Sequence, residues 1–484
     1  MKDFILKYKY CFIITLLFIL LRLPSLFEPY WYGDEGIYLT LGQAIRRGST
    51  LYSQIHDNKP PSLYYLAAIF PNLFGFRFLL TLFMIPTVYL FHKLAKLFLK
   101  EKTTRLATIL FLIFSSIPLF EGNISNAENF MLLPTIAAFL IFLKAKKNIH
   151  YFIVSFLLGI AFTIKIPVFI EFIFLFLWVF LENIKDIKKK FWPLLLKLFI
   201  FGVGFLLPTI LWGTYFVYLG AGPQFLGSAL LQNFSYLSSW ATGTQTASAS
   251  SGGLMTRLFF LFLYWLLTYI FYLRKKLSKN TTFLLFWLSA TLFGALLSTR
   301  PYPHYLIQSL PPLCILLFTF FLKKKDNNLF QKIFTALSIV TFVITIFSYK
   351  FYLYSTIKYY RNFYSFKSPI ARDAFFGDHV IVSQQIAGYV KNNTDYNDRI
   401  FLWGDQSYIY AMANRLPPGR YTVAYHIVDF NGYQETMAAI KTYLPKFIVY
   451  TPMSGRPFPE LDEFISKYYL LDKTFGSNLV FKLR

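Results

Sequence analysis

The side chains best suited to chemistry lie in two short segments near the beginning of the chain. The first segment places two adjacent carboxylates, Asp34 and Glu35, among tyrosine, tryptophan and glycine, and the second carries Asp57, Lys59 and Tyr64. A carboxylate that is partly removed from water has a raised pKa, which suits it to accept a proton from a hydroxyl group. A lysine ammonium is a compact positive charge that suits a phosphate group. The two segments therefore contain side chains that suit proton transfer and the binding of an anion.

Four further candidates lie in or beside long apolar runs, where a charged group is costly and is by default a functional candidate. They are Glu128, Lys165, Arg300 and His304. Arg300 is suited to be a second cation for a phosphate, and the alternative is an anchor at the membrane interface. Glu128 can instead cap a helix, and Lys165 can pair with Glu171. These alternatives stay open at this stage.

The elements that must position these residues are transmembrane helices. Of the 484 residues, 56% are hydrophobic and only 15% are charged, whereas an ordinary soluble domain has about 25% charged residues. Apolar runs near the ~20 residues that span a bilayer recur along residues 1–350 and indicate about 11 crossings. The expected spans are 10–27, 76–92, 106–120, 131–145, 151–164, 166–182, 191–219, 258–273, 282–298, 304–322 and 333–350. We expect the first run to be retained as a helix and not removed as a signal peptide.

The net charge of +25 at first suggests a nucleic-acid partner, but the distribution of the charge excludes that class. Lysine and arginine gather in short clusters at the ends of apolar runs, which is typical of cytoplasmic loops. The clusters occupy residues 2–9, 93–105, 144–147, 185–190, 274–279 and 323–332. This pattern predicts a multi-pass protein of the plasma (inner) membrane with its N-terminus in the cytoplasm. It places Asp34 and Lys59 on the non-cytoplasmic side.

Two long outer loops and a C-terminal domain follow from this topology. The loops are residues 28–75 and 220–257; the second contains a run of small polar residues that suits either a plain linker or a loop that gates the substrate site. In residues 351–484, strand-like segments at 399–403, 446–450 and 478–483 alternate with helix-like stretches near 379–392, 405–413, 434–443 and 459–468. We expect a small α/β domain outside the membrane.

One pair of predicted crossings is too short to span the membrane fully. Residues 151–181 must leave the cytoplasmic face and return to it, yet at ~1.5 Å per residue they cannot form two full spans of ~30 Å. We expect a turn at Lys165-Ile166-Pro167 that lies below the outer surface. Irregular backbone at that depth is tolerated where it lines a cavity.

Three motifs in order resemble the GT-C superfamily of integral-membrane glycosyltransferases. The most similar branch contains the protein O-mannosyltransferases and the lipid A aminoarabinose transferases. The motifs are Asp34-Glu35 followed by Tyr38, then Asp57-x-Lys59-Pro60-Pro61-x-x-Tyr64, and the segment Thr299-Arg300-Pro301-Tyr302-Pro303-His304 late in the apolar region. The resemblance extends over the order of the helices and the α/β tail, and therefore over most of the chain.

This resemblance implies a transmembrane catalytic domain over residues 1–350 and an extracytoplasmic α/β domain over 351–484. It implies transfer of a sugar, by a hexosyltransferase similar to the mannosyltransferases, from a polyprenyl-phosphate donor to an acceptor hydroxyl. Asp34 matches the catalytic carboxylate, with Glu35 as a second candidate, and Lys59 matches a lysine that contacts the donor phosphate. The simpler alternatives are a helix cap for Asp34, a dipole contact for Glu35 and an interfacial position for Lys59.

The remaining expected site residues complete the predicted set. We expect Arg300 and His304 to assist with the donor phosphate. Substrate binding is expected for Asp57, Tyr64, Glu128 and Lys165. His56, without an evident partner, is expected at the surface.

The expected partners are a polyprenyl-phosphate-linked sugar, membrane lipids and an acceptor that is a protein, a lipid or a glycan. No cofactor is expected, and neither Cys11 nor Cys314 belongs to a cysteine–histidine cluster, although a divalent metal is not excluded. The alternative function is a transporter or flippase for a lipid-linked saccharide. The absence of an evident inverted repeat in the sequence argues against it. A non-catalytic scaffold is the third possibility.

Overall fold

The computed structural model describes residues 2–184, 187–233, 251–297, 302–322, 329–348, 353–365, 367–452 and 455–484. The chain divides into two compact units. The first contains Met1–Leu23, Leu80–Trp212 and Gln232–Ile357; the second contains Pro24–Leu79, Gly213–Leu231 and Lys358–Arg484. The second unit therefore combines the first outer loop with the C-terminal region.

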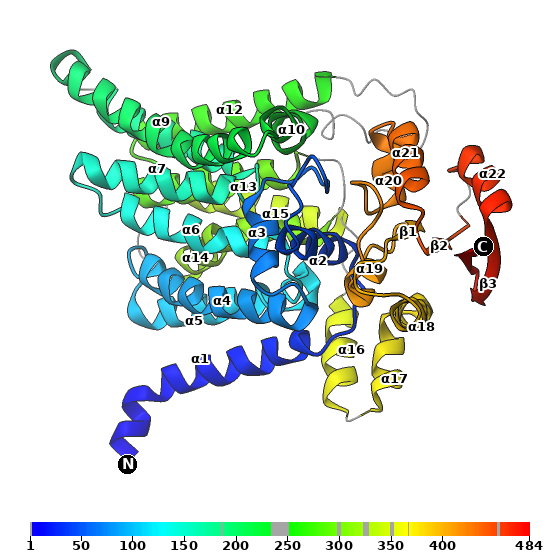
Figure 1. Cartoon of the computed structure of the whole chain (residues 1–484). Helices are drawn as coiled ribbons and strands as arrows, with labels where there is room; N and C mark the ends of the chain where they lie inside the picture. The colour runs from blue at the N-terminus through cyan, green and yellow to red at the C-terminus, as the bar shows by residue number, and fades with distance from the viewer. Residues whose placement is uncertain are drawn as a thin grey trace. The chain divides into compact units, whose positions relative to one another are not determined.

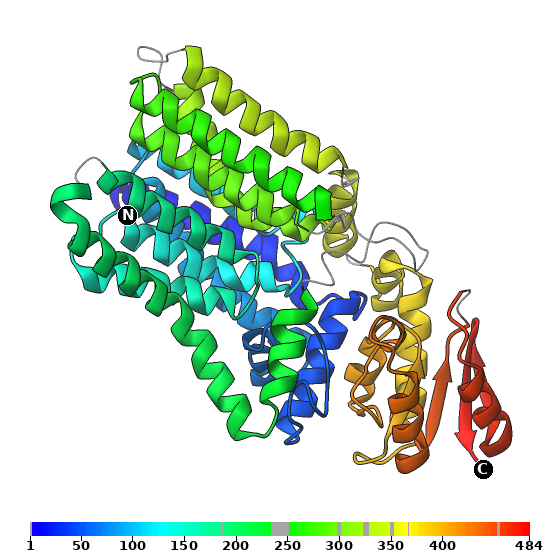
Figure 2. The ribbon, with the colours of Figure 1, turned by 90° about the horizontal axis from the view of Figure 1, so that it is seen from above.

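Each predicted crossing corresponds to a helix. The helices are α1 (Lys2–Leu26), α4 (Leu73–Ala95), α5 (Glu101–Phe114), α6 (Ala127–Phe142), α7 (Asn148–Phe162), α8 (Val168–Asn183), α9 (Ile187–Tyr218), α12 (Ser251–Leu273), α13 (Lys279–Ala295), α14 (Leu310–Leu322) and α15 (Leu329–Ser348). Among the described residues, α1, α4, α9 and α12 contain segments long and apolar enough to cross a membrane. Within the first unit, α6 lies beside α7, and α13 lies beside α8, α12 and α14 (Figures 1 and 2).

The predicted turn between two short crossings is present. Helix α7 ends at Phe162, and Pro167 occupies the N-cap position of α8. Proline suits this position because its missing N–H group has no intrahelical partner at a helix start. A second short connection, the 3₁₀ helix η1 (Pro118–Phe120), precedes α6. A third short connection, the 3₁₀ helix η4 (Pro303–Ser309), leads into α14. The depth of the α7–α8 turn in the membrane stays a prediction.

The second unit begins with short helices of the first outer loop, α2 (Gly33–Arg46) and α3 (Ser62–Ile69). Its middle segment forms α10 (Gly222–Phe225) and a short π-helix, η3 (Leu226–Leu231). The C-terminal region starts with three more short elements, α16 (Leu353–Tyr364), α17 (Pro369–Asp373) and the 3₁₀ helix η5 (Ala374–Phe376).

The C-terminal region contains the predicted α/β fold. Four strands form a sheet of order β1-β2-β4-β3: β1 (Ile400–Trp403), β2 (Phe447–Tyr450), β4 (Asn478–Leu483) and β3 (Tyr469–Phe475). β1 and β2 are parallel, and the other two pairs are antiparallel. The helices are α18 (Asp378–Asn392), α19 (Tyr408–Ala413), α20 (Ala424–Asp429), α21 (Tyr433–Tyr443) and α22 (Pro459–Tyr468).

Both faces of β1 and β2 are buried. Ile400 and Leu402 pack against α18 and α19, whereas Phe401 and Trp403 pack against α20, α21 and α22. This alternation follows from the two-residue period of a strand. Strands buried on both faces carry continuous apolar runs, which is why β1 and β2 are recognisable in the sequence. Among the described elements of residues 378–484, β3 and α20 were not predicted, because most of β3 is exposed and α20 is very short; the short elements α16, α17 and η5 that precede them were not predicted either.

Candidate active site

Helix α2 places Asp34 in its first turn. The N-cap residue is Tyr32, without a side-chain cap, so the alternative that Asp34 caps this helix is wrong. The Asp34 side chain is 30% exposed. One turn along the helix, the hydroxyl group of Tyr38 donates a hydrogen bond of 3.0 Å to Asp34 Oδ2. Lys59 Nζ lies 3.4 Å from the same oxygen. Asp34 is therefore a partly exposed carboxylate beside the Lys59 ammonium.

The loop before α3 holds Lys59 firmly in this position. The Lys59 backbone N–H donates to the Tyr64 hydroxyl at 3.1 Å, and its carbonyl oxygen accepts from the Tyr52 hydroxyl at 2.8 Å. Its ammonium lies 5.0 Å from the centroid of the Tyr38 ring and 3.8 Å from Asp57 Oδ2. Four of the predicted residues are thus adjacent. We refer to Asp34, Tyr38, Asp57, Lys59 and Tyr64 as the Asp34 cluster.

Asp57 is a buried carboxylate, with only 1% of its side chain exposed. Burial alone raises its pKa, but the charges of Lys59 and His426 outweigh that effect and the pKa of Asp57 is lowered. Asp57 Oδ1 also accepts a hydrogen bond of 2.7 Å from the backbone of Asn58. An ionised Asp57 therefore neutralises part of the Lys59 charge from inside the protein.

Two buried histidines extend the Asp34 cluster. His426 Nε2, from α20, lies 3.6 Å from Asp57 Oδ1. The His56 ring meets the His426 ring edge to face, and its Nδ1 lies 3.3 Å from Ser228 Oγ. The expectation that His56 lies at the surface is wrong, since the residue is 1% exposed. Burial and the charge of His426 lower the pKa of His56 to about 3. Nothing in the sequence near His426 pointed to this contact.

Glu35 points away from this cluster into a buried ion network. Both Glu35 oxygens accept hydrogen bonds from Arg77, at 2.9 and 2.5 Å. The third guanidinium nitrogen of Arg77, Nη1, lies 2.8 Å from Glu28 Oε2, which also accepts a hydrogen bond from Trp31 at 2.6 Å. Arg77 is fully buried, so its charge must be matched in place. The network links α2 and α4 and fixes the start of α2.

One face of α2 packs closely against α19 along its whole length. Ser407 Oγ donates to the Gly33 carbonyl oxygen, and Thr40 Oγ1 donates to the Ser407 carbonyl oxygen at 3.3 Å. Further along, the side chains of the next two residues on this face donate to backbone oxygens: Gln43 to Ala411 and Arg47 to Asn414. The α2 positions recur at the three- and four-residue spacing of one helix face. We refer to this contact as the α2–α19 seam.

Gly36 shows how close the seam is. A Cβ atom at Gly36 would lie 2.5 Å from the backbone nitrogen of Tyr408 and 2.7 Å from Ser407 Oγ. Such separations force the backbone apart. The seam therefore requires glycine at this position, two residues after Asp34.

In the first unit, three predicted residues from distant segments also meet. Lys165 Nζ lies 2.8 Å from Glu128 Oε1, at the start of α6. His304, in η4, lies 2.5 Å from Glu121 through Nδ1 and 3.9 Å from Glu128 through Nε2. The Lys165 ammonium also lies 5.0 Å from the centroid of the Tyr305 ring. We refer to Glu121, Glu128, Lys165, His304 and Tyr305 as the Glu128 cluster.

Lys165 does not pair with Glu171, the partner that the sequence suggested. Glu171 accepts a hydrogen bond of 2.7 Å from Trp287, and Lys165 pairs with Glu128 instead. Glu128 follows Asn126, the N-cap residue of α6, and so does not cap that helix itself. Glu121 was not predicted, although its αL backbone (φ 55°) marks an unusual position.

Two other expectations cannot be placed. Arg300 and residues 241–250 of the small-polar run lie outside the described residues, and the last three residues of that run, 251–253, begin α12. Across the part of the chain that the structure describes, no group of three or more histidine, cysteine, aspartate and glutamate side chains is arranged to hold a metal ion.

Comparison with known proteins addresses the fold. No model of a protein family matches the sequence, and no curated protein matches it. Among solved structures, the chain is similar to ArnT from Cupriavidus metallidurans in the apo state, with a TM-score of 0.59, 13% identity, and coverage of 99% of this chain and 98% of that one. It is also similar to the same protein bound to undecaprenyl phosphate, with a TM-score of 0.57, 11% identity and 98% coverage of each chain.

These similarities extend over the whole length of both chains. ArnT is a lipid A aminoarabinose transferase of the GT-C superfamily, the branch that the motifs of the first outer loop resemble. At this level of identity the comparison concerns the fold and not the substrates. The chain therefore has the same fold as ArnT, with a small C-terminal α/β region.

Proposed function

We propose that this protein is a membrane glycosyltransferase that moves a sugar from a polyprenyl-phosphate donor to a hydroxyl group of an acceptor. The observation that carries this proposal is the Asp34–Lys59 pair, which joins a partly exposed carboxylate to a cation. In the same fold, ArnT has been solved with undecaprenyl phosphate bound. A base and a phosphate ligand in contact are the two groups that such a transfer requires.

The chemistry assigns a separate task to each partner. Asp34 accepts the proton of the acceptor hydroxyl while the oxygen of that hydroxyl forms a bond to the anomeric carbon of the sugar. The bond from that carbon to the phosphate oxygen breaks, and its electron pair leaves with the polyprenyl phosphate. Lys59 stabilises the charge that develops on the departing phosphate. When the Lys59 ammonium moves from Asp34 to the phosphate, Asp34 Oδ2 can accept the proton of the acceptor hydroxyl.

The buried members of the Asp34 cluster act through Lys59. Asp57 and Tyr64 are almost fully buried and contact the ammonium and the backbone of Lys59, respectively. We therefore propose that they position Lys59 and do not touch the sugar. Glu35 is not part of the proposed catalytic set, because both of its oxygens are bonded to Arg77.

We propose that the Glu128 cluster binds hydroxyl groups of a sugar. Glu121 and Glu128 flank His304, so the carboxylates of the cluster outnumber its one lysine, Lys165. A carboxylate close to His304 opposes a phosphate group there. Carboxylates readily accept hydrogen bonds from sugar hydroxyls, and the nearby Tyr305 ring offers an apolar surface. His304 is accordingly assigned to sugar binding and not to the donor phosphate.

The proposed function includes an orientation of the protein in the membrane. The basic clusters between the apolar runs favour a cytoplasmic N-terminus. The Asp34 cluster and the C-terminal region then lie on the non-cytoplasmic face of the plasma membrane, where lipid-linked sugars are used. A mannosyl-like hexose is the proposed sugar class, on the motif resemblance alone.

Mass spectrometry of lipids and glycans tests the proposed function. Cells without the gene are compared with cells that express the wild-type protein, Asp34→Asn or the control Asp395→Asn, in which an exposed aspartate changes. We expect one sugar mass to be missing from an acceptor without the gene and with Asp34→Asn, and the lipid-linked sugar to accumulate. Full restoration by Asp34→Asn would contradict the proposed base and leave transport of the lipid-linked sugar as the alternative.

A further inference from the structure

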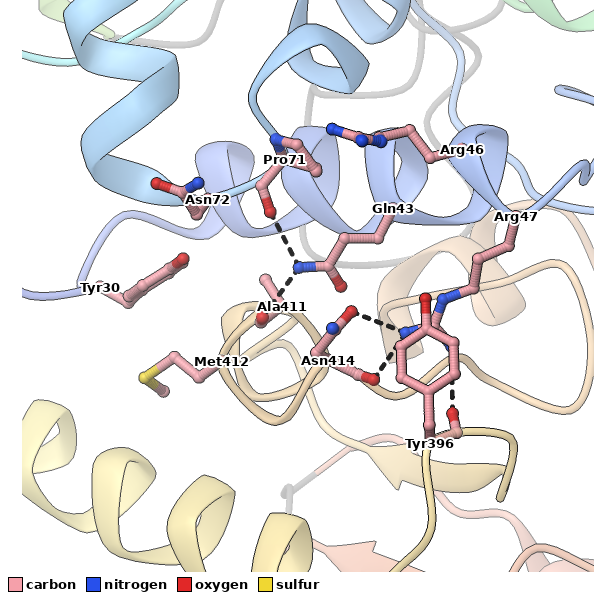
Figure 3. A pocket seen from close by; sticks show the side chains of 10 residues that line it. All are labelled: Tyr30, Gln43, Arg46, Arg47, Pro71, Asn72, Tyr396, Ala411, Met412 and Asn414. Atoms are coloured by element: carbon pink, nitrogen blue, oxygen red, sulfur yellow. Dashed lines mark hydrogen bonds between the residues drawn. The ribbon is translucent and has the colours of Figure 1, made fainter.

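A cavity in the second unit is separate from the Asp34 cluster and has no role in the proposed transfer step. It has a volume of about 590 Å³, within the ~300–1,000 Å³ range of small-molecule sites. Figure 3 shows Gln43 and Arg47 of α2 on one side and Asn414 opposite them, with Tyr30 and Tyr396 at the two ends. A smaller cavity of about 280 Å³ is lined by Arg47 as well, together with Arg399.

The residues that line these cavities carry positive charge and no negative charge; Asp398 lies outside both linings and interacts with Arg415. Neither lining contains an aspartate or a glutamate. Arg46, Arg47 and Arg399 line them, and the buried Arg415 lies behind. Within the described ranges, none of these four arginines is within ion-pair distance of a carboxylate. Burial, together with the charges of Arg415 and Arg399, lowers the pKa of Arg47, as expected where like charges gather.

The arginines are held in place by neutral groups. Arg47 donates to the backbone and side-chain oxygens of Asn414 at 2.7 and 2.6 Å, and its guanidinium lies 3.9 Å from the centroid of the Tyr396 ring. Arg415 donates to the backbone oxygen of Thr394 at 2.6 Å. Arg46 has a weaker contact, 3.4 Å to the carbonyl oxygen of Ile69. Contacts of this kind orient the guanidinium groups and leave their charge available to an anion.

Gln43 adds a second and independent feature. Its side chain is 6% exposed, and its NH₂ group donates to the carbonyl oxygens of Pro71 and Ala411 at 3.0 and 2.9 Å (Figure 3). Its acceptor atom Oε1 is buried and has no hydrogen-bond partner among the described residues. A buried acceptor without a donor is unfavourable, and a hydroxyl group of a ligand would satisfy it.

We infer that this cavity binds a saccharide that carries a carboxylate or phosphate group. The acidic group pairs with Arg46 and Arg47, a sugar hydroxyl donates to Gln43 Oε1, and the Tyr30 and Tyr396 side chains border the sugar. The inference rests on the proposed function, because the saccharide is then part of the acceptor. Gln43 follows Asp34 on the same helix by nine residues, which is about 14 Å along the helix axis. An acceptor of several sugar units therefore extends along α2 from the cavity to its reactive hydroxyl.

Direct binding tests this inference without the donor. The purified full-length protein in detergent is titrated calorimetrically with trigalacturonic acid, which carries carboxylates, and with neutral maltotriose. We expect binding of trigalacturonic acid only, weakened by added salt because the contact is ionic. Arg46→Gln should weaken it at least tenfold, and the control Arg361→Gln, at an exposed arginine outside the cavity, should not. Equal binding of maltotriose, or full binding by Arg46→Gln with an unchanged melting temperature, would overturn the inference.

Two further comparisons are needed. One tests whether the cavity binds a phosphorylated sugar, and the other separates the cavity inference from the proposed transferase function. Glucose 6-phosphate should bind more tightly than inorganic phosphate, because only the sugar supplies a hydroxyl to Gln43; equal affinities would overturn the saccharide assignment. Asp34→Asn should bind trigalacturonic acid normally. If only the cavity assignment is wrong, Arg46→Gln transfers sugar at the wild-type rate. If only the transferase function is wrong, the cavity still binds the acid while no variant transfers sugar.

Discussion

The hydroxyl group of Ser407 donates a hydrogen bond of 2.9 Å to the carbonyl oxygen of Gly33, 374 residues earlier in the chain. This contact joins the first residue of α2 to the C-terminal region, immediately before Asp34. The α2–α19 seam repeats such contacts as far as Arg47 and Asn414. The position of the proposed base therefore depends on residues at the far end of the sequence.

Gly36→Ala tests whether the seam positions Asp34. The added Cβ would lie 2.5 Å from the backbone nitrogen of Tyr408, so α2 must move. Overpacking of this kind costs about 1–3 kcal/mol, and we expect a lower kcat together with a lower melting temperature. Gly388→Ala is the control, because a Cβ there meets nothing within 4 Å and alanine favours a helix. A fully active and stable Gly36→Ala protein would show that the seam does not position the base.

Asp34→Asn separates chemistry from stability in the purified protein. Asparagine keeps the shape of the side chain but cannot accept the acceptor proton, so transfer should fall by about 10²–10⁴. Because Tyr32 and not Asp34 is the N-cap residue, both Asp34→Asn and Asp34→Ala should keep nearly the wild-type melting temperature. Turnover and thermal unfolding are measured side by side. An asparagine variant with wild-type turnover would remove Asp34 from the mechanism.

Lys59 and Asp57 should behave as a coupled pair. Lys59→Ala removes a charge-assisted contact to the donor phosphate, worth about 1.5–3 kcal/mol, and leaves the buried Asp57 without its nearest cation. Donor affinity and stability should both fall, and Lys59→Arg should restore part of each. In a double-mutant cycle, Asp57→Asn should recover the stability of Lys59→Ala but not its donor affinity. Wild-type donor affinity in Lys59→Ala would rule out the phosphate role.

The buried Arg77 network should make a large contribution to folding. Arg77→Ala leaves Glu28 and Glu35 buried without their cation, and removal of one partner from a buried ion pair costs about 3–5 kcal/mol. The exposed pair of Arg105 and Glu101 is the control; its loss in Arg105→Ala should cost only about 0.3–0.5 kcal/mol. Thermal unfolding in detergent compares the two. Similar melting temperatures for the two variants would contradict this assignment.

The buried His56 predicts a loss of stability in mild acid. Its folded-state pKa of about 3 lies below the usual value for histidine, so below pH ~6.5 the unfolded chain binds a proton that the folded protein excludes. The free energy of unfolding should therefore fall as the pH decreases from ~6.5 towards ~3, by up to about 1.4 kcal/mol per pH unit for one proton. The lowered pKa of His426 acts in the same direction.

Replacement of His56, with the exposed His379 as a control, tests whether His56 causes this dependence of stability on pH. His56→Gln should flatten the dependence of stability on pH between ~4 and ~6.5. His379→Gln, at an exposed histidine, should keep it. Denaturant unfolding at several pH values measures both slopes. An unchanged slope in His56→Gln would show that folding does not change the proton affinity of His56.

Local patterns in the sequence predicted a large part of this structure. Each of the apolar runs that were predicted to cross the membrane corresponds to a helix between α1 and α15. Pro167 marked the turn between α7 and α8. Asp34, Asp57 and Lys59 were grouped correctly because they lie within one loop. The strands β1 and β2 were recognisable because continuous apolar runs accompany burial on both faces.

Contacts between distant segments left no local signal. Glu171 seemed the natural partner of Lys165 because it is close in sequence, but the chain brings Glu128 to Lys165 from another helix. His426 lies on a helix too short to be recognised, and its contact with Asp57 depends on the complete fold. Most of β3 is exposed, so β3 lacks the apolar run that identified the other strands.

The α2–α19 seam also has a consequence for the synthesis of the protein. Gly33 leaves the ribosome 374 residues before Ser407, which at about 5–20 residues per second is a delay of about 20–75 s. During that interval the chain enters the membrane with Asp34 and Lys59 already made but without the helix that holds α2 in place. Unfinished chains should consequently be unable to consume the lipid-linked donor, and a ribosome that stops before residue 407 should release an inert membrane protein.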